Sequence, residues 1–213
     1  MAIQVIKIVF GLFIFLAVSF VFFGAAQAFF SDNETSEDNV ISTSSDQSTL
    51  VINEVYYDPD SSHMEGEDPN ENDFEWVEIY NPTDYTVNLK DWKILDNSTE
   101  RLITSSDRNL APGEFVILGK AENVRIIWSI EAEKFIPIGQ KLGNGLANVG
   151  DRVILKDDEE NVIDQISYGS DDTILNPSIT DVSEGHSIER NPDGLDSDSA
   201  TDFVDMDIPT PGT

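Results

Sequence analysis

The sequence predicts an all-β protein, either a sandwich or a barrel, on three observations. Short runs in which apolar and polar residues alternate recur from residue 49 onwards, and such alternation is typical of strands with one buried face. Gly, Pro, Asn and Asp separate these runs, which indicates turns between strands. Hydrophobic residues make up 39% of the 213 residues, which is enough for one domain with a core.

The N-terminal segment predicts export. An apolar run over residues 8–23 is followed by the small residues of Ala26-Gln27-Ala28, as expected of a signal peptide, residues 1–28, that is cut after Ala28. An uncleaved membrane anchor is the alternative, because the uncharged stretch 8–30 is long enough to span a bilayer as a helix. In both cases we expect the rest of the chain to be exported, secreted or at the cell surface, and to meet the membrane only through this segment.

Two further regions follow along the chain. Residues 29–48 are polar and acidic and are expected to form a disordered spacer, and the folded domain is expected over residues 49–213. Residues 58–73 are an acidic insertion, and residues 157–161 are a polar turn that indicates a hairpin. Strands are expected at residues 50–57, 74–80, 86–89, 92–95, 101–104, 115–118, 152–156 and 162–168.

One segment, residues 121–135, has a helical rather than an alternating pattern. Val124, Ile127, Trp128 and Ile130 fall on one face of a helix. We therefore expect a short crossover helix within the all-β fold.

Glu75 and Glu78 raise the question of catalysis, because two carboxylates can act as an acid and a base. Successive side chains of a strand point to opposite faces, and these two are an odd number of positions apart. We therefore expect them on opposite faces, where they do not converge on one substrate atom. The expected arrangement places Val77 and Ile79 in the core, and Trp76 and Tyr80 on the outer surface beside a solvated Glu78.

The charge of the chain limits its partners. A net charge of −29 repels phosphate backbones, since nucleic-acid binding needs Lys and Arg to displace counterions, so no nucleic-acid partner is expected. Such acidity suits a solvated extracellular surface, a saline environment or bound divalent cations. The chain has no Cys, which excludes disulfides, thiol catalysis and Cys-based zinc sites.

The two histidines, His63 and His186, are the remaining candidates for acid–base chemistry. Neither lies in a nucleophile or metalloprotease motif. Ser187 follows His186 directly, and adjacent residues seldom form a nucleophile–base pair. We expect both histidines at the surface, no catalytic residue and no enzymatic activity.

Acidic loops offer a candidate metal site. Calcium takes six to eight hard oxygen ligands in flexible geometry, and Asp196, Asp198 and Asp202 have a suitable spacing. The EF-hand pattern is absent, because Thr201 stands where that loop requires Gly. Calcium is therefore a candidate cofactor, and a solvated acidic loop is the alternative.

Other residues have structural explanations. Arg190 lies among carboxylates and is expected to be a salt-bridge partner. The tryptophans at 76, 92 and 128 offer a carbohydrate platform, but packing within the fold is the default interpretation. Asn33 and Asn97 begin glycosylation sequons, which matter only if the host glycosylates exported proteins.

Six segments, taken in order, resemble the lamin tail domain family in its prokaryotic, exported form. They read VINEVYYDP (51–59), EWVEIYNPTDYTVNLKDWKI (75–94), LAPGEFVIL (110–118), ANVGDRVILKDDEENVIDQISYG (147–169), GHSIERNPDG (185–194) and DFVDMDIPTPG (202–212). The resemblance implies an immunoglobulin-like β-sandwich that binds or supports other molecules without chemistry of its own. Animal lamin tails are linked with DNA contact, which does not carry over to a chain without a basic patch.

Three functional hypotheses remain. The first is a non-catalytic interaction or structural module of the cell surface, whose partners are other surface proteins or glycans. The second is a calcium-dependent adhesion or surface-assembly domain. The third is a hydrolase, which would need a cluster of histidines and carboxylates that the sequence does not indicate. The oligomeric state is left open.

Overall fold

The structure is a computed structural model and describes residues 49–67 and 69–213. The signal peptide or anchor expected at residues 1–28 and the spacer expected at residues 29–48 lie outside these residues. Within the described part, no helix is both long enough and apolar enough to cross a membrane.

The described part is mostly strand with little helix, as predicted for an all-β fold. Its elements are β1 (Val51–Tyr56), η1 (Ser61–His63), η2 (Glu71–Asp73), β2 (Trp76–Tyr80), β3 (Val87–Asn88), β4 (Lys93–Leu95), β5 (Glu100–Leu102), β6 (Asn109–Leu110), β7 (Phe115–Gly119), α2 (Glu122–Ile127), η3 (Ala132–Lys134), β8 (Phe135–Pro137), β9 (Arg152–Lys156), β10 (Val162–Ser167), β11 (Ser187–Arg190), η4 (Ala200–Asp202) and β12 (Phe203–Met206). The α and η segments are short, so the strands carry the fold.

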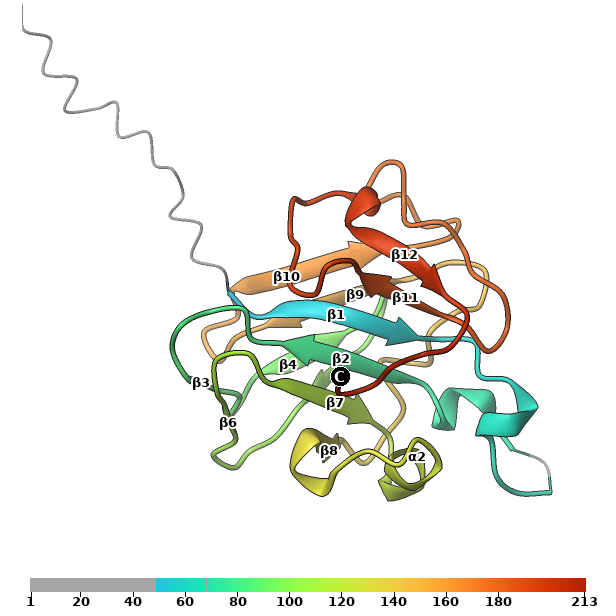
Figure 1. Cartoon of the computed structure of the whole chain (residues 1–213), viewed down its shortest axis with the longest axis horizontal. Coiled ribbons are helices and arrows are strands. Elements are labelled where there is room, and N and C mark those ends of the chain that lie inside the picture. The colour runs from blue at the N-terminus through green and yellow to red at the C-terminus, as the bar shows by residue number, and fades with distance from the viewer. Residues whose placement is uncertain (1–48, 68) are drawn as a thin grey trace, which may run out of the picture. The chain divides into compact units, whose positions relative to one another are not determined.

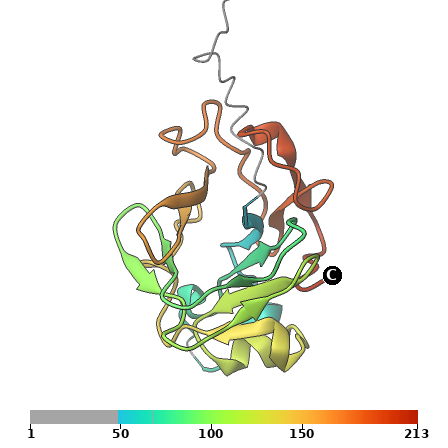
Figure 2. The ribbon, with the colours of Figure 1, turned by 90° about the vertical axis from the view of Figure 1, so that its left-hand side faces the viewer.

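The strands form two main sheets. One has six strands in the order β12-β11-β1-β2-β7-β8, and the other has four in the order β10-β9-β4-β5, while β3 and β6 pair separately. Figure 1 shows the four-stranded sheet behind the six-stranded one, and Figure 2, turned by 90°, shows the two sheets side by side. Neighbouring strands are antiparallel except β7 and β8, which are parallel because α2 and η3 connect them as a crossover.

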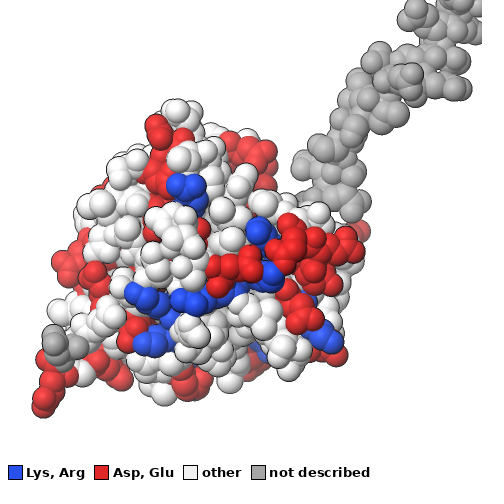
Figure 3. Space-filling model, turned by 180° about the vertical axis from the view of Figure 1, so that it is seen from behind, with Lys and Arg blue, Asp and Glu red and all other residues white. Residues whose placement is uncertain are grey.

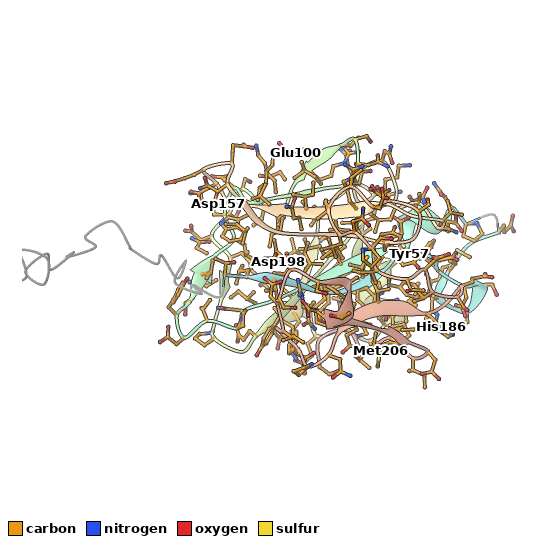
Figure 4. All side chains as sticks on the ribbon, turned by 90° about the horizontal axis from the view of Figure 1, so that it is seen from above. Tyr57, Glu100, Asp157, His186, Asp198 and Met206 are labelled. Atoms are coloured by element: carbon orange, nitrogen blue, oxygen red, sulfur yellow. The ribbon has the colours of Figure 1, made fainter. Side chains whose placement is uncertain are left out.

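The main core lies between the two sheets. Val77 and Ile79 of β2 face it, as predicted, and meet Ile94 of β4 and Leu155 of β9 in one buried cluster. Tyr57, at the end of β1, lies between the two layers, with Glu100 and His186 towards opposite sides of the molecule (Figure 4). The fold is thus a sandwich with its largest apolar cluster between the sheets.

A β-bulge in β1 changes which residues face the core. The pairing with β2 shifts between Ile52 and Glu54, so one extra residue, Asn53, is inserted. Ile52 faces the core before the bulge, and Val55 faces it afterwards. The bulge therefore turns Glu54 towards the outer face of the six-stranded sheet.

The helix expected over residues 121–135 is shorter in the structure. α2 ends at Ile127, Ser129 takes a left-handed conformation (φ 56°), and η3 and β8 occupy the end of the segment. The chain must return beside β7, where Phe135 and Ile136 are buried, and this packing ends the helix. Strands β6, β8, β11 and β12 were not predicted.

Candidate functional site

Glu75 and Glu78 point to opposite faces of the six-stranded sheet, as their odd spacing predicts. Glu75 accepts a hydrogen bond from Leu146 N (3.1 Å) on the core side, and Glu78 accepts one from Gly212 N (2.6 Å) over the outer face. The prediction of a solvated Glu78 is wrong, because both residues are 1% exposed. Trp76 is likewise fully buried instead of covering the surface, because distant segments cover this face.

The C-terminal segment, residues 207–213, lies across the outer face of the six-stranded sheet (Figure 1). Two glutamates that stand opposite each other on β1 and β2, Glu54 and Glu78, bind its backbone. Thr210 N donates to Glu54 Oε1 (3.1 Å) and Gly212 N donates to Glu78 Oε2 (2.6 Å). Alternate backbone amides of the segment therefore bind carboxyls on neighbouring strands, which fixes the segment across the sheet.

Burial raises the pKa of Glu54, Glu75 and Glu78 to about 8. At Glu54 the hydrogen bond from Ser187 opposes this effect, and the charge of Glu78 adds to it. These carboxyls are thus mostly protonated at neutral pH. Because they are at most 1% exposed, no substrate reaches them, and they serve as structural hydrogen-bonding groups.

A second apolar cluster covers the same outer face beside the C-terminal segment. Tyr56 stacks on Trp76 (ring centroids 5.6 Å apart), and Trp128 meets Tyr56 edge to face (5.0 Å). His63 lies parallel to Trp128 at 4.0 Å. Trp92 belongs to the core between the sheets, so the three tryptophans form no common carbohydrate platform, and packing explains their positions.

His63 and His186, which are distant in the sequence, line one cavity of about 280 Å³. The His63 Nδ1 is 2.6 Å from Asp60 Oδ1, and the His186 Nδ1 is 2.7 Å from Asp205 Oδ1. Both side chains are partly exposed, at 28% and 29%, so the expected surface histidines are each held by an aspartate. Glu184 also lines the cavity. The acidic side chains of the cavity favour cations over anions.

The contacts of His63 do not form a catalytic triad. Ser62 Oγ (3.2 Å) and Asp60 Oδ1 (2.6 Å) both approach the Nδ1 of His63. In a triad the serine and the carboxylate bind different ring nitrogens, so that the ring moves a proton from one side to the other. Here Ser62 and Asp60 approach the same ring nitrogen. If Asp60 orients the ring through Nδ1, this nitrogen does not also take the proton of Ser62, so the arrangement of a triad is not formed.

Arg190 is a buried salt-bridge partner, as predicted. It is 2% exposed, and its guanidinium lies 3.0 Å from Asp164, 3.2 Å from Asp196 and 3.5 Å from Asp202. It also lies over the Phe203 ring at 4.5 Å. A buried charge is stable only with such partners, so Arg190 joins β11 to β10 and to the acidic loop.

In the acidic loop that contains Asp196, Asp198 and Asp202, two of the three carboxylates already bind groups of the protein itself. Burial alone would raise the pKa of Asp202, but hydrogen bonds from Ser197 and Ser199 outweigh burial and lower it. Asp196 faces Arg190, and Asp198 is exposed. Within residues 49–67 and 69–213, no three His, Cys, Asp or Glu side chains are grouped to hold a metal ion. Calcium binding by Asp196, Asp198 and Asp202 stays a prediction.

The two sequons have different standing in the structure. Asn97 is exposed in the turn between β4 and β5. Asn33 lies outside the described residues. Glycosylation at both positions stays a prediction.

Glu54 and Asn53 were not predicted as structural residues. Asn53 Nδ2 donates to Glu78 Oε1 (3.0 Å), and Asn53 Oδ1 accepts from Gly194 N (3.0 Å). Every residue of β1 is buried, including these two polar ones. A polar pair inside an otherwise apolar strand was the available signal, since strands with both faces covered carry few polar residues.

The comparison with known protein families agrees with this fold. A model of the lamin tail domain matches residues 43–170, which is more than half of the chain. The chain belongs to the lamin tail domain family. No curated protein matches it.

The family match does not cover the whole domain. It ends at residue 170, whereas the sequence resemblance extends to residue 212. Yet β11 and β12, which follow the matched part, complete the six-stranded sheet next to β1. Residues 171–213 are therefore part of the same sandwich and supply the segment that Glu54 and Glu78 hold.

Proposed function

We propose that this chain is an exported, immunoglobulin-like interaction or structural module of the cell surface, without catalytic activity, that binds other surface proteins or glycans. The observation that carries the proposal is its membership of a family of non-enzymatic, immunoglobulin-like domains. The use of the buried carboxyls as structural groups supports it. So does the apolar N-terminal run, which favours export.

The surface charge supports the absence of a nucleic-acid partner from the proposal. Figure 3 shows acidic side chains around a band of Lys and Arg on the face of the four-stranded sheet. Lys93 lies 2.9 Å from Glu100, and Lys156 lies 3.6 Å from Glu160. Since carboxylates already neutralise these cations, the band is a poor site for a nucleic-acid backbone.

The location can be tested in the native host with the full chain carrying a C-terminal epitope. We expect the epitope in the medium or on the cell surface, accessible to protease added outside. Surface cross-linking should then join it to other surface proteins or glycans. An epitope found only inside the cell would contradict the proposal. Hydrolysis of ester or phosphoester substrates that is lost on replacing His63 or His186 would establish the hydrolase instead.

Calcium-dependent adhesion is the alternative proposal, and it rests on the acidic loops. Thermal unfolding of residues 29–213 with EDTA, calcium or magnesium at matched ionic strength tests it. Calcium at a hundred times its dissociation constant should stabilise the fold by about 2.7 kcal/mol. A shift in melting temperature that calcium alone produces, and that Asp198→Ala removes, would support adhesion. Equal shifts with calcium and magnesium would mean that the acidic residues act only as general surface charge.

A further inference from the structure

Strand β12 is an edge of the six-stranded sheet, with β11 on one side and no strand of the described residues on the other (Figure 1). The hydrogen bond from Asn191 N to Asp202 O (2.9 Å) fixes the phase of this antiparallel pair. Bonded and non-bonded pairs alternate along such a ladder. Val204, opposite Glu189, therefore turns its N–H and C=O towards β11, and Asp205 turns its own towards the open edge.

An apolar cavity of about 270 Å³ opens beside this edge, between β12 and residues 177–182. Ile179, Val182, Ile188 and Phe203 line it, each at most 9% exposed. Drug-sized pockets measure roughly 300–1,000 Å³, so this smaller cavity suits one or two side chains. A side chain from a strand lying along β12 can enter it.

The positions along β12 define which side chains fit. Phe203 lies opposite Arg190 and Asp205 opposite the core residue Ile188, so both point to the core side, where the cavity lies. A strand added to β12 places one side chain beside Phe203 and another, two positions along, beside Asp205. The first position is apolar and the second is acidic.

The charge around the cavity selects a basic partner. Asp181 and Asp205 both line it, without any Lys or Arg among its lining residues. Asp181 accepts a hydrogen bond from Tyr57 and Asp205 binds His186, in both cases through Oδ1 (2.7 Å), so Oδ2 of each carboxylate faces a partner. The Asp205 side chain is 54% exposed. A second copy of the chain, with its net charge of −29, is repelled by this edge, whereas a basic segment is attracted.

We infer that the β12 edge binds an extended, basic peptide segment of a partner protein as an added strand, with an apolar side chain beside Phe203 and a basic one beside Asp205. Main-chain hydrogen bonds supply affinity in this mode and the side-chain positions supply specificity. The inference rests on the proposed function, for which it names a contact surface and the chemical class of the partner.

Two of the other sheet edges, β8 and β10, are less suited to such a strand. At the far end of the same sheet, β8 contains Pro137, which has no N–H to donate. In the other sheet, β10 lies against β1, where Ile52 N donates to Asp164 Oδ2 (2.6 Å) and Thr49 Oγ1 to Ile163 O (3.4 Å).

The test uses the full chain in a non-ionic detergent and a short fluorescent peptide. The centre of the peptide is leucine, valine and lysine, and threonine and lysine alternate on both sides. Fluorescence anisotropy should show saturable binding that Val204→Lys and Asp205→Pro weaken at least about tenfold, because the first repels the peptide and the second removes the outward N–H. Val162→Lys is the matched control, an equally drastic change at a 50% exposed valine on β10, and should leave affinity within about twofold.

Two control peptides test the mode of binding. Replacing every lysine by glutamate, or methylating the backbone nitrogens of the central residues, should each reduce affinity at least about tenfold. The inference is overturned if Val162→Lys weakens binding as much as Val204→Lys does, if the methylated peptide binds equally well, or if no binding saturates. It is also overturned if Val204→Lys instead dissociates a dimer of the chain. These outcomes concern the β12 edge alone, whereas the cellular location and surface cross-links test the proposed function.

Discussion

The outer faces of the two sheets differ in the burial of their ionisable residues. On the six-stranded sheet, Glu54 and Glu78 lie beneath the C-terminal segment with their pKa raised to about 8 by burial. On the four-stranded sheet, a hydrogen bond from Lys93 lowers the pKa of Glu160, and the pair is open to solvent. The outer face of the six-stranded sheet is therefore a second buried interior of the protein. The outer face of the four-stranded sheet is exposed to solvent, although the same core lies between the two sheets.

The largest expected difference between the faces concerns apolar packing. Ile117→Ala should lower the free energy of unfolding by about 2–5 kcal/mol, because it removes most of a fully buried side chain from the outer cluster. The matched change Ile154→Ala, at a half-buried residue outside the core cluster on β9, should cost clearly less. Urea unfolding of both variants measures this, and equal losses would mean that the outer face of the six-stranded sheet is not an interior.

The next largest effect is expected from the hydrogen bond between Glu78 and the C-terminal segment. Glu78→Ala leaves Gly212 N–H without its acceptor and leaves Asn53 Nδ2 with Asp193 as its remaining acceptor, which should cost about 1–3 kcal/mol. Amide hydrogen exchange at Gly212 should also become faster than in the unmodified protein. Unchanged protection of Gly212 would show that other contacts hold the segment.

The smallest effect is expected for the ion pairs of the four-stranded sheet. Glu160→Gln should leave the melting temperature almost unchanged in physiological salt, because exposed pairs contribute little and are screened. Lys93 also keeps Glu100 as a partner. A clear drop that disappears at high salt would show that this band stabilises the sheet after all.

Much of the fold follows from local patterns. The strands around β1 and β2, the hairpin of β9 and β10, and the opposite directions of Glu75 and Glu78 were predictable, because a period of two and the turn residues encode them. The salt-bridge role of Arg190 was also predictable, since a lone basic residue among carboxylates needs a partner.

Long-range packing explains what the sequence did not indicate. β11 holds the buried polar residues Ser187 and Arg190, which break the alternation expected of a strand. The burial of Glu78 depends on Gly212, which lies 134 residues further along the chain. The meeting of His63 and His186 in one cavity likewise depends on the sandwich topology and not on any local motif.

The most direct test of the second interior is the pH dependence of stability with and without the Glu54 carboxyl. A raised pKa means that the native state keeps a proton that the unfolded chain releases, so the free energy of unfolding should fall as pH rises from about 4.5 to about 8, by at most about 1.4 kcal/mol per pH unit for each such group. Below this range stability should fall again, because lowered pKa values such as that of Asp202 favour the charged native form.

Glu54→Gln is the variant to compare, because Oε1 accepts from Ser187 and Thr210 while Oε2 has no partner in the described residues, so that the new amide nitrogen can stand there. Urea unfolding of residues 29–213 at pH values from 5 to 9 would give the two curves. We predict that the unmodified protein loses stability across this range and that the variant loses less, with Glu160→Gln parallel to the unmodified protein. A flat curve for the unmodified protein, or a Glu54→Gln curve parallel to it, would contradict the account of this face as an interior.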